Sequence, residues 1–319
     1  MGSKFFESRR NVVLASLGVA LGIVLALIIR SSIGSQAGST SKVQATHQES
    51  VGEVVERHLG WADQEVTEGL APQLAPVREF FAEARRGTRP FADDALSFES
   101  KWKLASDYFS GGKEHVRFIE QRFSARLFSP EQLEKIVEQA VAGYLRHLDD
   151  VDSALLINLQ ADLADVSPGG LRAGVDRQAI GHLLDTAIRD AVRAVEADFR
   201  GLVGQQLVSF VAGEVLSLAS VELATSAGII GVGASSGLVT FGVGIIVGII
   251  VDYVVSWAYD KLVDPVGEMS SKLNQKLSEL ESFILNGNGV QPGLEGRLHE
   301  YAQRRSQTRN VVIQSAVLP

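Results

Sequence analysis

The sequence predicts an all-α protein with an N-terminal transmembrane anchor, a body built as an extended helical hairpin or bundle, and a glycine-rich hydrophobic helical hairpin near the C-terminus. Three observations favour this fold class. An apolar run begins at Asn11, apolar residues recur at helical spacing after Ser129, and no charged residue lies between Leu223 and Val251. The alternation of apolar and polar residues that is typical of β-strands is absent throughout.

The anchor spans residues 11–30 and follows a short cytoplasmic N-terminus, residues 1–10. A helix rises about 1.5 Å per residue, so this apolar run just crosses the roughly 30 Å hydrocarbon core of a bilayer. Basic residues concentrate on the cytoplasmic side of membrane spans. Three of them precede the run, namely Lys4, Arg9 and Arg10. We therefore expect a membrane location with the N-terminus in the cytoplasm and the body exported, as in a bacterial inner membrane facing the periplasm.

A cleaved signal peptide is the alternative to an uncleaved anchor. Ser35-Gln36-Ala37 offers small residues at a cleavage-like position, but the apolar run is longer than a usual signal core and ends in Arg30. An uncleaved anchor is the preferred interpretation. Residues 31–46 are rich in Ser, Gly and Gln without an apolar period, which predicts a flexible tether.

Composition disfavours several classes of function. The formal net charge of −8 argues against nucleic acid as a partner, because phosphate binding needs a basic face. The chain has no cysteine, which excludes disulfides, thiolate metal sites and cysteine nucleophiles. The six histidines are scattered, without a pair at metal-binding spacing. We predict no catalytic, cofactor-binding or metal-binding residues, no cofactor and no small-molecule substrate.

The exported body covers residues 47–206. Its clearest helix begins at Ser129-Pro130-Glu131-Gln132, which supplies an N-cap, a first-turn proline and a capping-box partner. A heptad-like apolar stripe follows and predicts packing against another long helix: Val137, Val141, Tyr144, Leu148, Val151 and Leu155. A loop at 167–170 precedes a second long helix that opens near Asp176, so we expect an αα-hairpin. The stripe of the second helix comprises Ile180, Leu184, Ala187, Ile188, Ala191, Val195, Phe199 and Leu202.

Residues 207–257 are expected to form a glycine-rich, membrane-seeking hairpin, with arms at about 207–230 and 238–257. Small residues four positions apart let helix backbones approach closely in a bilayer. Two glycine pairs have this helix-packing spacing, Gly233/Gly237 and Gly244/Gly248. Aromatic residues near the end of the second arm are typical of a membrane interface: Tyr253, Trp257 and Tyr259. The alternative is a buried core hairpin of a soluble helical domain.

Two carboxylates interrupt the first arm. Glu214 and Glu222 are eight positions apart and so lie on nearly the same helical face. Carboxylates inside a membrane are costly and usually face a protein interior or water, so the pair is a candidate pore lining or oligomer interface. In the alternative, which we prefer for these two residues, the first arm stays outside the lipid and both glutamates face solvent beside the membrane.

Residues 258–319 are expected to form an amphipathic helix and a basic tail. Apolar residues recur at helical spacing up to the terminator at 286–289: Met269, Leu273, Leu277, Leu280 and Ile284. A short helix from about Leu294 should precede the tail, whose basic residues are Arg304, Arg305 and Arg309.

These features predict a non-enzymatic protein that acts in the assembly or scaffolding of an envelope membrane complex. The expected partners are the lipid bilayer and either further copies of the chain or other subunits of a membrane complex. The alternative is a pore- or channel-forming protein in which the amphipathic first arm, with Glu214 and Glu222, lines an aqueous path.

Overall fold

The computed structural model divides the chain into two compact units, residues 1–47 and 48–319. It describes residues 49–110, 113–165, 180–198, 202, 204–226, 243–259 and 264–318. The expected anchor and tether therefore lie outside the described residues, as does the expected turn at 231–237. Within the described ranges the regular secondary structure is helical and contains no strand, which confirms the all-α prediction.

The described residues form eleven helices. They are α2 (Val51–Glu68), α3 (Leu70–Arg86), α4 (Thr88–Ala95), α5 (Phe98–Ser110), α6 (Glu114–Arg126), α7 (Pro130–Asp165), α8 (Ile180–Asp198), α9 (Gln205–Ser226), α10 (Val243–Tyr259), α11 (Pro265–Asn286) and α12 (Leu294–Val317).

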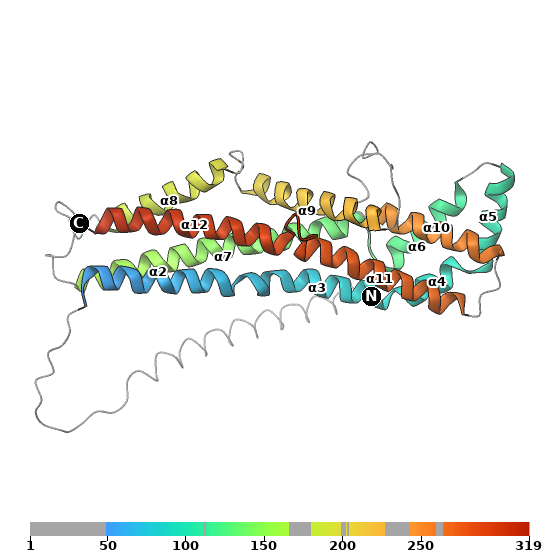
Figure 1. Ribbon diagram of the computed structural model, residues 1–319, viewed down its shortest axis with the longest axis horizontal. Helices are drawn as coiled ribbons and strands as arrows, with labels where there is room; N and C mark the ends of the chain where they lie inside the picture. The colour runs from blue at the N-terminus through green and yellow to red at the C-terminus, as the bar shows by residue number, and fades with distance from the viewer. Residues whose placement is uncertain are drawn as a thin grey trace, which may run out of the picture. The chain divides into compact units, whose positions relative to one another are not determined.

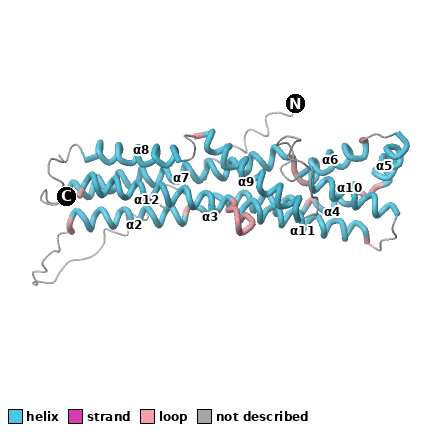
Figure 2. Tube along the Cα trace, turned by 45° about the horizontal axis from the view of Figure 1, so that its top comes forward, coloured by secondary structure: helices cyan, strands magenta, loops and turns pink. Residues whose placement is uncertain are grey.

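These helices follow one another as four antiparallel rods (Figures 1 and 2). The first rod is α2–α3–α4, and the α5–α6 hairpin connects it to α7, which returns as the second rod. The third rod is α8–α9–α10, and α11–α12 returns as the fourth. Each rod packs on the two beside it: α2 and α3 on α7, α7 on α8 and α9, α8 on α12, α9 on α11, and α11 on α3 and α4. The second unit is therefore an up-down-up-down bundle that closes on itself.

Capping residues determine where two of the long helices begin. Ser50 Oγ accepts a hydrogen bond from the backbone N–H of Glu53, whose side chain accepts one from the backbone N–H of Ser50. The predicted capping box at Ser129 is confirmed, because Ser129 Oγ lies 3.3 Å from the backbone nitrogen of Gln132 and Gln132 Oε1 lies 2.8 Å from that of Ser129. Pro130 then opens the 36-residue α7, which is about 54 Å long.

The predicted apolar stripes form the core of the bundle. All six stripe residues of α7 are at most 5% exposed. In α8, the buried stripe residues are Leu184, Ala187, Ile188, Ala191 and Val195, whereas the side chains of Ile180 and Phe199 lie outside the described set. α7 and α8 are in contact, as the expected αα-hairpin requires, but α8 packs more extensively on α12 than on α7.

α9 and α10 contain the two arms of the glycine-rich segment. Among the described helices, α9 alone is long and apolar enough to cross a membrane by length and composition, and 44% of its most apolar window is buried inside the unit. The two helices follow one another along the third rod (Figures 1 and 2), which differs from the expected side-by-side hairpin. The reason is that each helix has other apolar neighbours, α7 and α11 for α9, and α6 and α11 for α10.

The C-terminal region differs from the expectation of a short helix and a basic tail. α11 ends at Asn286 as predicted, where Gly287 adopts a φ of +80° that favours glycine. α12, however, continues for 24 residues through the expected tail. Arg305 and Arg309 are buried in it, because carboxylates of neighbouring helices neutralise them.

Candidate functional site

The α5–α6 hairpin at one end of the bundle carries the strongest candidate for an interaction site. α6 is the main neighbour of α5, and α6 in turn packs on α4 and α10. α5 is therefore attached to the bundle through one side.

The outer side of α5 presents two large aromatic side chains. Phe98 is 81% exposed and Trp102 is 70% exposed, and their spacing of four places both on one face of the helix. Lys101 and Ala105 are exposed on the same face. We call these four residues the aromatic face of α5. Most of the other large apolar side chains of the described residues are buried, so such exposure of two adjacent rings marks a contact surface.

The inner side of α5 is held to α6 by polar contacts. Ser100 Oγ lies 3.0 Å from His115 Nε2, and both residues are buried. The Asp107 carboxylate accepts hydrogen bonds from the backbone N–H groups of Glu114 and His115, at 3.0 and 2.8 Å. Asp107 thus satisfies two free donors at the start of α6. Because the Ser100 hydroxyl is fully buried, this pair fastens the hairpin rather than offering a nucleophile.

His115 is electrostatically strained in this position. Its Nδ1 atom is buried without a hydrogen-bond partner among the described residues. Burial lowers the pKa of His115 below its usual value, and the nearby charge of Asp107 opposes this with a smaller effect. The imidazole is therefore held in its neutral form at neutral pH.

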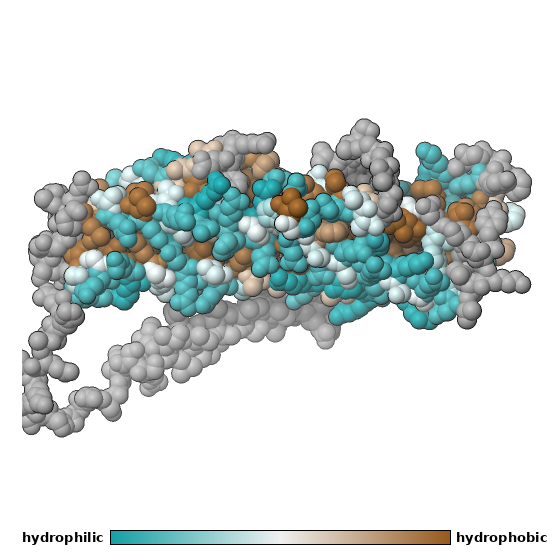
Figure 3. Space-filling view, in the orientation of Figure 1, coloured by the Kyte–Doolittle hydropathy of each residue, from teal (hydrophilic) through white to brown (hydrophobic). Residues whose placement is uncertain are grey.

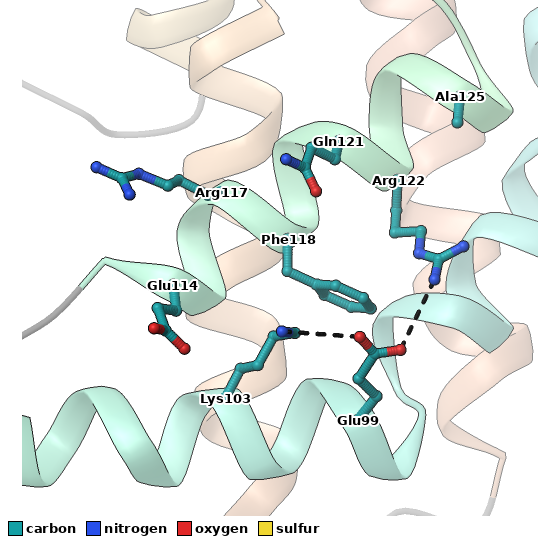
Figure 4. Close-up of a pocket in the computed structure, with 8 residues that line it drawn as sticks. All are labelled: Glu99, Lys103, Glu114, Arg117, Phe118, Gln121, Arg122 and Ala125. Atoms are coloured by element: carbon teal, nitrogen blue, oxygen red, sulfur yellow. Dashed lines mark ion pairs between the residues drawn. The ribbon is translucent and has the colours of Figure 1, made fainter.

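A groove of about 510 Å³ lies between α5 and α6 (Figure 4). Phe118 is its central ring, with Lys103 Nζ 5.7 Å and Arg122 Cζ 5.1 Å from the ring centroid. Glu99 bridges both cations, at 3.7 Å from each. The polar groups that line the groove are thus largely engaged with one another, and the aromatic face of α5 points away from them.

A second cluster, buried between α12, α7 and α2, joins three helices through charge. Asp152, only 3% exposed, binds Arg305 with one oxygen at 2.7 Å and Arg309 with the other at 2.8 Å. Arg305 also binds Asp149, and Arg309 binds Asp63. Each guanidinium therefore has two carboxylate partners, as a buried cation requires.

Sequence reasoning missed this cluster, although it left a signal. Asp152 lies beside Leu148 and Leu155 on the core side of α7, and Arg305 and Arg309 continue the buried row of Leu298, Tyr301 and Ile313 in α12. Charges of opposite sign that interrupt two apolar stripes indicate a buried ion pair.

The structure gives partners to both glutamates of the first arm. Glu214 Oε1 accepts a hydrogen bond from Arg297 at 2.7 Å, and Glu222 Oε1 accepts one from Asn288 at 2.6 Å. Both partners belong to the fourth rod and the loop within it. In this conformation the two carboxylates fasten α9 to the rest of the bundle.

The remaining residues singled out from the sequence fall partly inside the described ranges. Gly233 and Gly237 lie outside them, as do the side chains of Trp257 and Tyr259. Gly244 and Gly248 are helical residues of α10. Tyr253 Oη donates a hydrogen bond to the backbone oxygen of Pro265 at 3.3 Å, and Lys272 Nζ lies 4.6 Å from its ring centroid.

Comparison of the chain with protein-family models, with curated proteins and with solved structures found no match. Among the residues that the structure describes, no group of three or more His, Asp or Glu side chains is arranged to hold a metal ion.

Proposed function

We propose that the protein is a non-enzymatic, membrane-anchored scaffold of an envelope membrane complex, and that its bundle associates with further copies through α9 and α10. The proposal rests on a row of residues along the outside of α9. At steps of four, this row comprises Ser209, Gly213, Ser217, Val221 and Thr225.

The single observation that carries the proposal is the open space around the glycines of this rod. A methyl group added at Gly213 or Gly248 would meet no described atom within 4 Å. Glycine in a helix interior costs about 1 kcal/mol relative to alanine, and contacts within the chain give no compensation for that cost at these two positions. Close approach of a second helix, which small residues permit, does give one.

Charge supports the same surface. The charged residues of α9 are Glu214 and Glu222, and both are bound to the fourth rod. The row therefore presents small, uncharged side chains to its surroundings. Figure 3 shows hydrophobic patches between the hydrophilic residues on the displayed face. A surface of this kind can pack against an identical helix without burying a charge.

Chemical crosslinking of the full chain in native membranes tests the proposal. We expect multimers in the wild type and a several-fold loss of them in the double variant Gly213→Leu/Gly248→Leu. Leucine favours helix and meets open space, so the helices themselves should persist.

The matched control is Gly60→Leu in α2, because Gly60 is also an exposed helical glycine with no described atom near its added methyl. This control should crosslink like the wild type. Only monomers in the wild type, or equal loss in the control, would contradict the proposal.

A pore- or channel-forming protein is the second candidate, favoured by the length and apolar composition of α9. It requires α9 to exchange its bundle contacts for lipid and to release Glu214 from Arg297 and Glu222 from Asn288. The double variant Glu214→Gln/Glu222→Gln should then change the conductance or ion selectivity of the protein in planar bilayers. Wild-type protein without conductance would exclude this candidate.

A further inference from the structure

We propose that the aromatic face of α5 (Phe98, Lys101, Trp102 and Ala105) inserts its two rings into the interfacial region of an anionic lipid bilayer. This inference names a lipid contact for the scaffold and rests on its proposed membrane location. It concerns a part of the bundle that is separate from the α9 row.

The residue types on this face match the interface of a membrane. Tryptophan and phenylalanine on one side of a short helix, together with lysine, are typical of helices that lie in the plane of the headgroups. Trp102 combines an apolar ring system with an N–H donor, and such side chains concentrate at the level of the headgroups. The polar and charged residues of α5 that contact α6 lie on its other side.

The charge of the hairpin favours an anionic surface. Residues 98–126 contain six Lys and Arg against four Asp and Glu, in a chain whose formal net charge is −8. Two of these four carboxylates are engaged within the described hairpin, Glu99 with Lys103 and Arg122, and Asp107 with the start of α6. The hairpin is thus a locally basic region of an acidic protein, and basic residues near a membrane are attracted to acidic lipid.

The size of the face favours lipid over a folded protein partner. α5 has 13 residues and is about 20 Å long. A stable interface between two proteins buries about 800 Å² on each partner, which one exposed side of so short a helix does not provide by itself. Insertion of two rings into a bilayer needs no such area, because lipid surrounds each ring on its own.

The geometry of the inner contacts makes α5 suitable for this role. The Ser100–His115 hydrogen bond and the Asp107 cap attach the helix to α6, so the outer face can meet a membrane without unfolding of the hairpin. Substitution of Phe98 or Trp102 should likewise leave the fold intact, because both side chains are mostly exposed.

Fluorescence of Trp102 in reconstituted full-length protein tests the proposal. The other two tryptophans are replaced by Trp61→Phe and Trp257→Phe, and circular dichroism verifies the fold. In vesicles with about a third of anionic phosphatidylglycerol and with dibrominated acyl chains, we expect at least a twofold loss of Trp102 emission compared with unbrominated vesicles. About 0.5 M salt should reverse much of this loss, because it screens the lysines.

Phe98→Ser in the same background is the companion variant and should reduce the quenching by a further measurable factor while leaving the circular dichroism unchanged. Quenching of equal size in vesicles of phosphatidylcholine alone would overturn the requirement for anionic lipid. Ready quenching by aqueous acrylamide without quenching by bromolipid would overturn the proposal. Protection from both quenchers would indicate a protein partner and would overturn it as well.

Flotation of the vesicles separates this inference from the proposed membrane location. Protein that floats with lipid while Trp102 remains open to acrylamide contradicts only the lipid contact of α5. Protein that does not float contradicts the membrane location itself.

Discussion

At the scale of single residues, the bundle depends on Asp152, whose two oxygens bind two buried arginines. Guanidinium groups stay charged at all accessible pH values, so Arg305 and Arg309 must find anionic partners wherever α12 packs. Asp63 and Asp149 contribute, but both are more exposed than Asp152 and therefore more weakly coupled to the arginines.

Asp152→Ala should destabilise the protein by about 3–5 kcal/mol, because it leaves both guanidinium groups buried without their shared counter-charge. Urea unfolding of the full chain, followed by circular dichroism in the detergent that keeps it in solution, measures the change. Asp150→Asn is the matched control, since Asp150 is exposed on the same helix, and it should stay within about 0.5 kcal/mol of the wild type. Equal effects of the two variants would show that the cluster contributes nothing to folding.

His115 should make the stability of the protein fall at acidic pH. Its folded pKa is lowered, so the unfolded chain binds a proton more readily than the folded one. The contribution is fully present above the unfolded value of about 6.5 and is lost as the pH falls through the folded pKa. His115→Gln should remove this part of the pH dependence of urea unfolding. Exposed His299 is the control position, and His299→Gln should leave the profile unchanged.

At the scale of single helices, α7 gains its starting point from the reciprocal hydrogen bonds between Ser129 and Gln132. Ser129→Ala should destabilise the bundle by about 1 kcal/mol, because a backbone donor of the first turn loses its acceptor. The change appears as a lower midpoint in the same urea titration. Ser153→Ala, at an exposed position inside α7, removes a hydroxyl without removing a cap and should have little effect. A comparable loss in both variants would contradict the role of the cap.

The helices that sequence alone predicted well are those with strong local signals. The capping box, the proline and the apolar stripe of α7 act within a few residues of one another, so their outcome was predictable. α12 was underestimated because its core row includes Arg305 and Arg309, which sequence reasoning assigns to the surface. Their burial depends on Asp152, more than 150 positions away in the chain, and no local pattern reports such a partner.

The candidate site was missed for a related reason. In sequence, Phe98 and Trp102 resemble ordinary core residues at helical spacing, and only the packing of α5 on α6 shows which side remains uncovered. The partners of Glu214 and Glu222 likewise depend on how the fourth rod folds back. The order of the four rods follows from many weak preferences for contact, and no single motif in the sequence encodes it.

At the scale of the whole molecule, the closed arrangement of the four rods implies that the second compact unit folds without the first. Each rod buries its apolar side against two others within residues 48–319, and the described core lies entirely inside that range. The apolar residues that remain accessible lie on α5, on the outside of α9 and at a few scattered positions.

A fragment of residues 48–319 should therefore keep the helical content of the full chain and a cooperative urea transition with a similar midpoint. It should nevertheless remain detergent-dependent or oligomeric, because the α9 row and the aromatic face of α5 are still present in it. Circular dichroism and light scattering with and without detergent measure the two properties. A fragment that is folded, freely soluble and monomeric would show that bundle packing alone satisfies the apolar segment 207–257. Both the scaffold and the pore proposals would then fail, since each requires lipid or another subunit against α9.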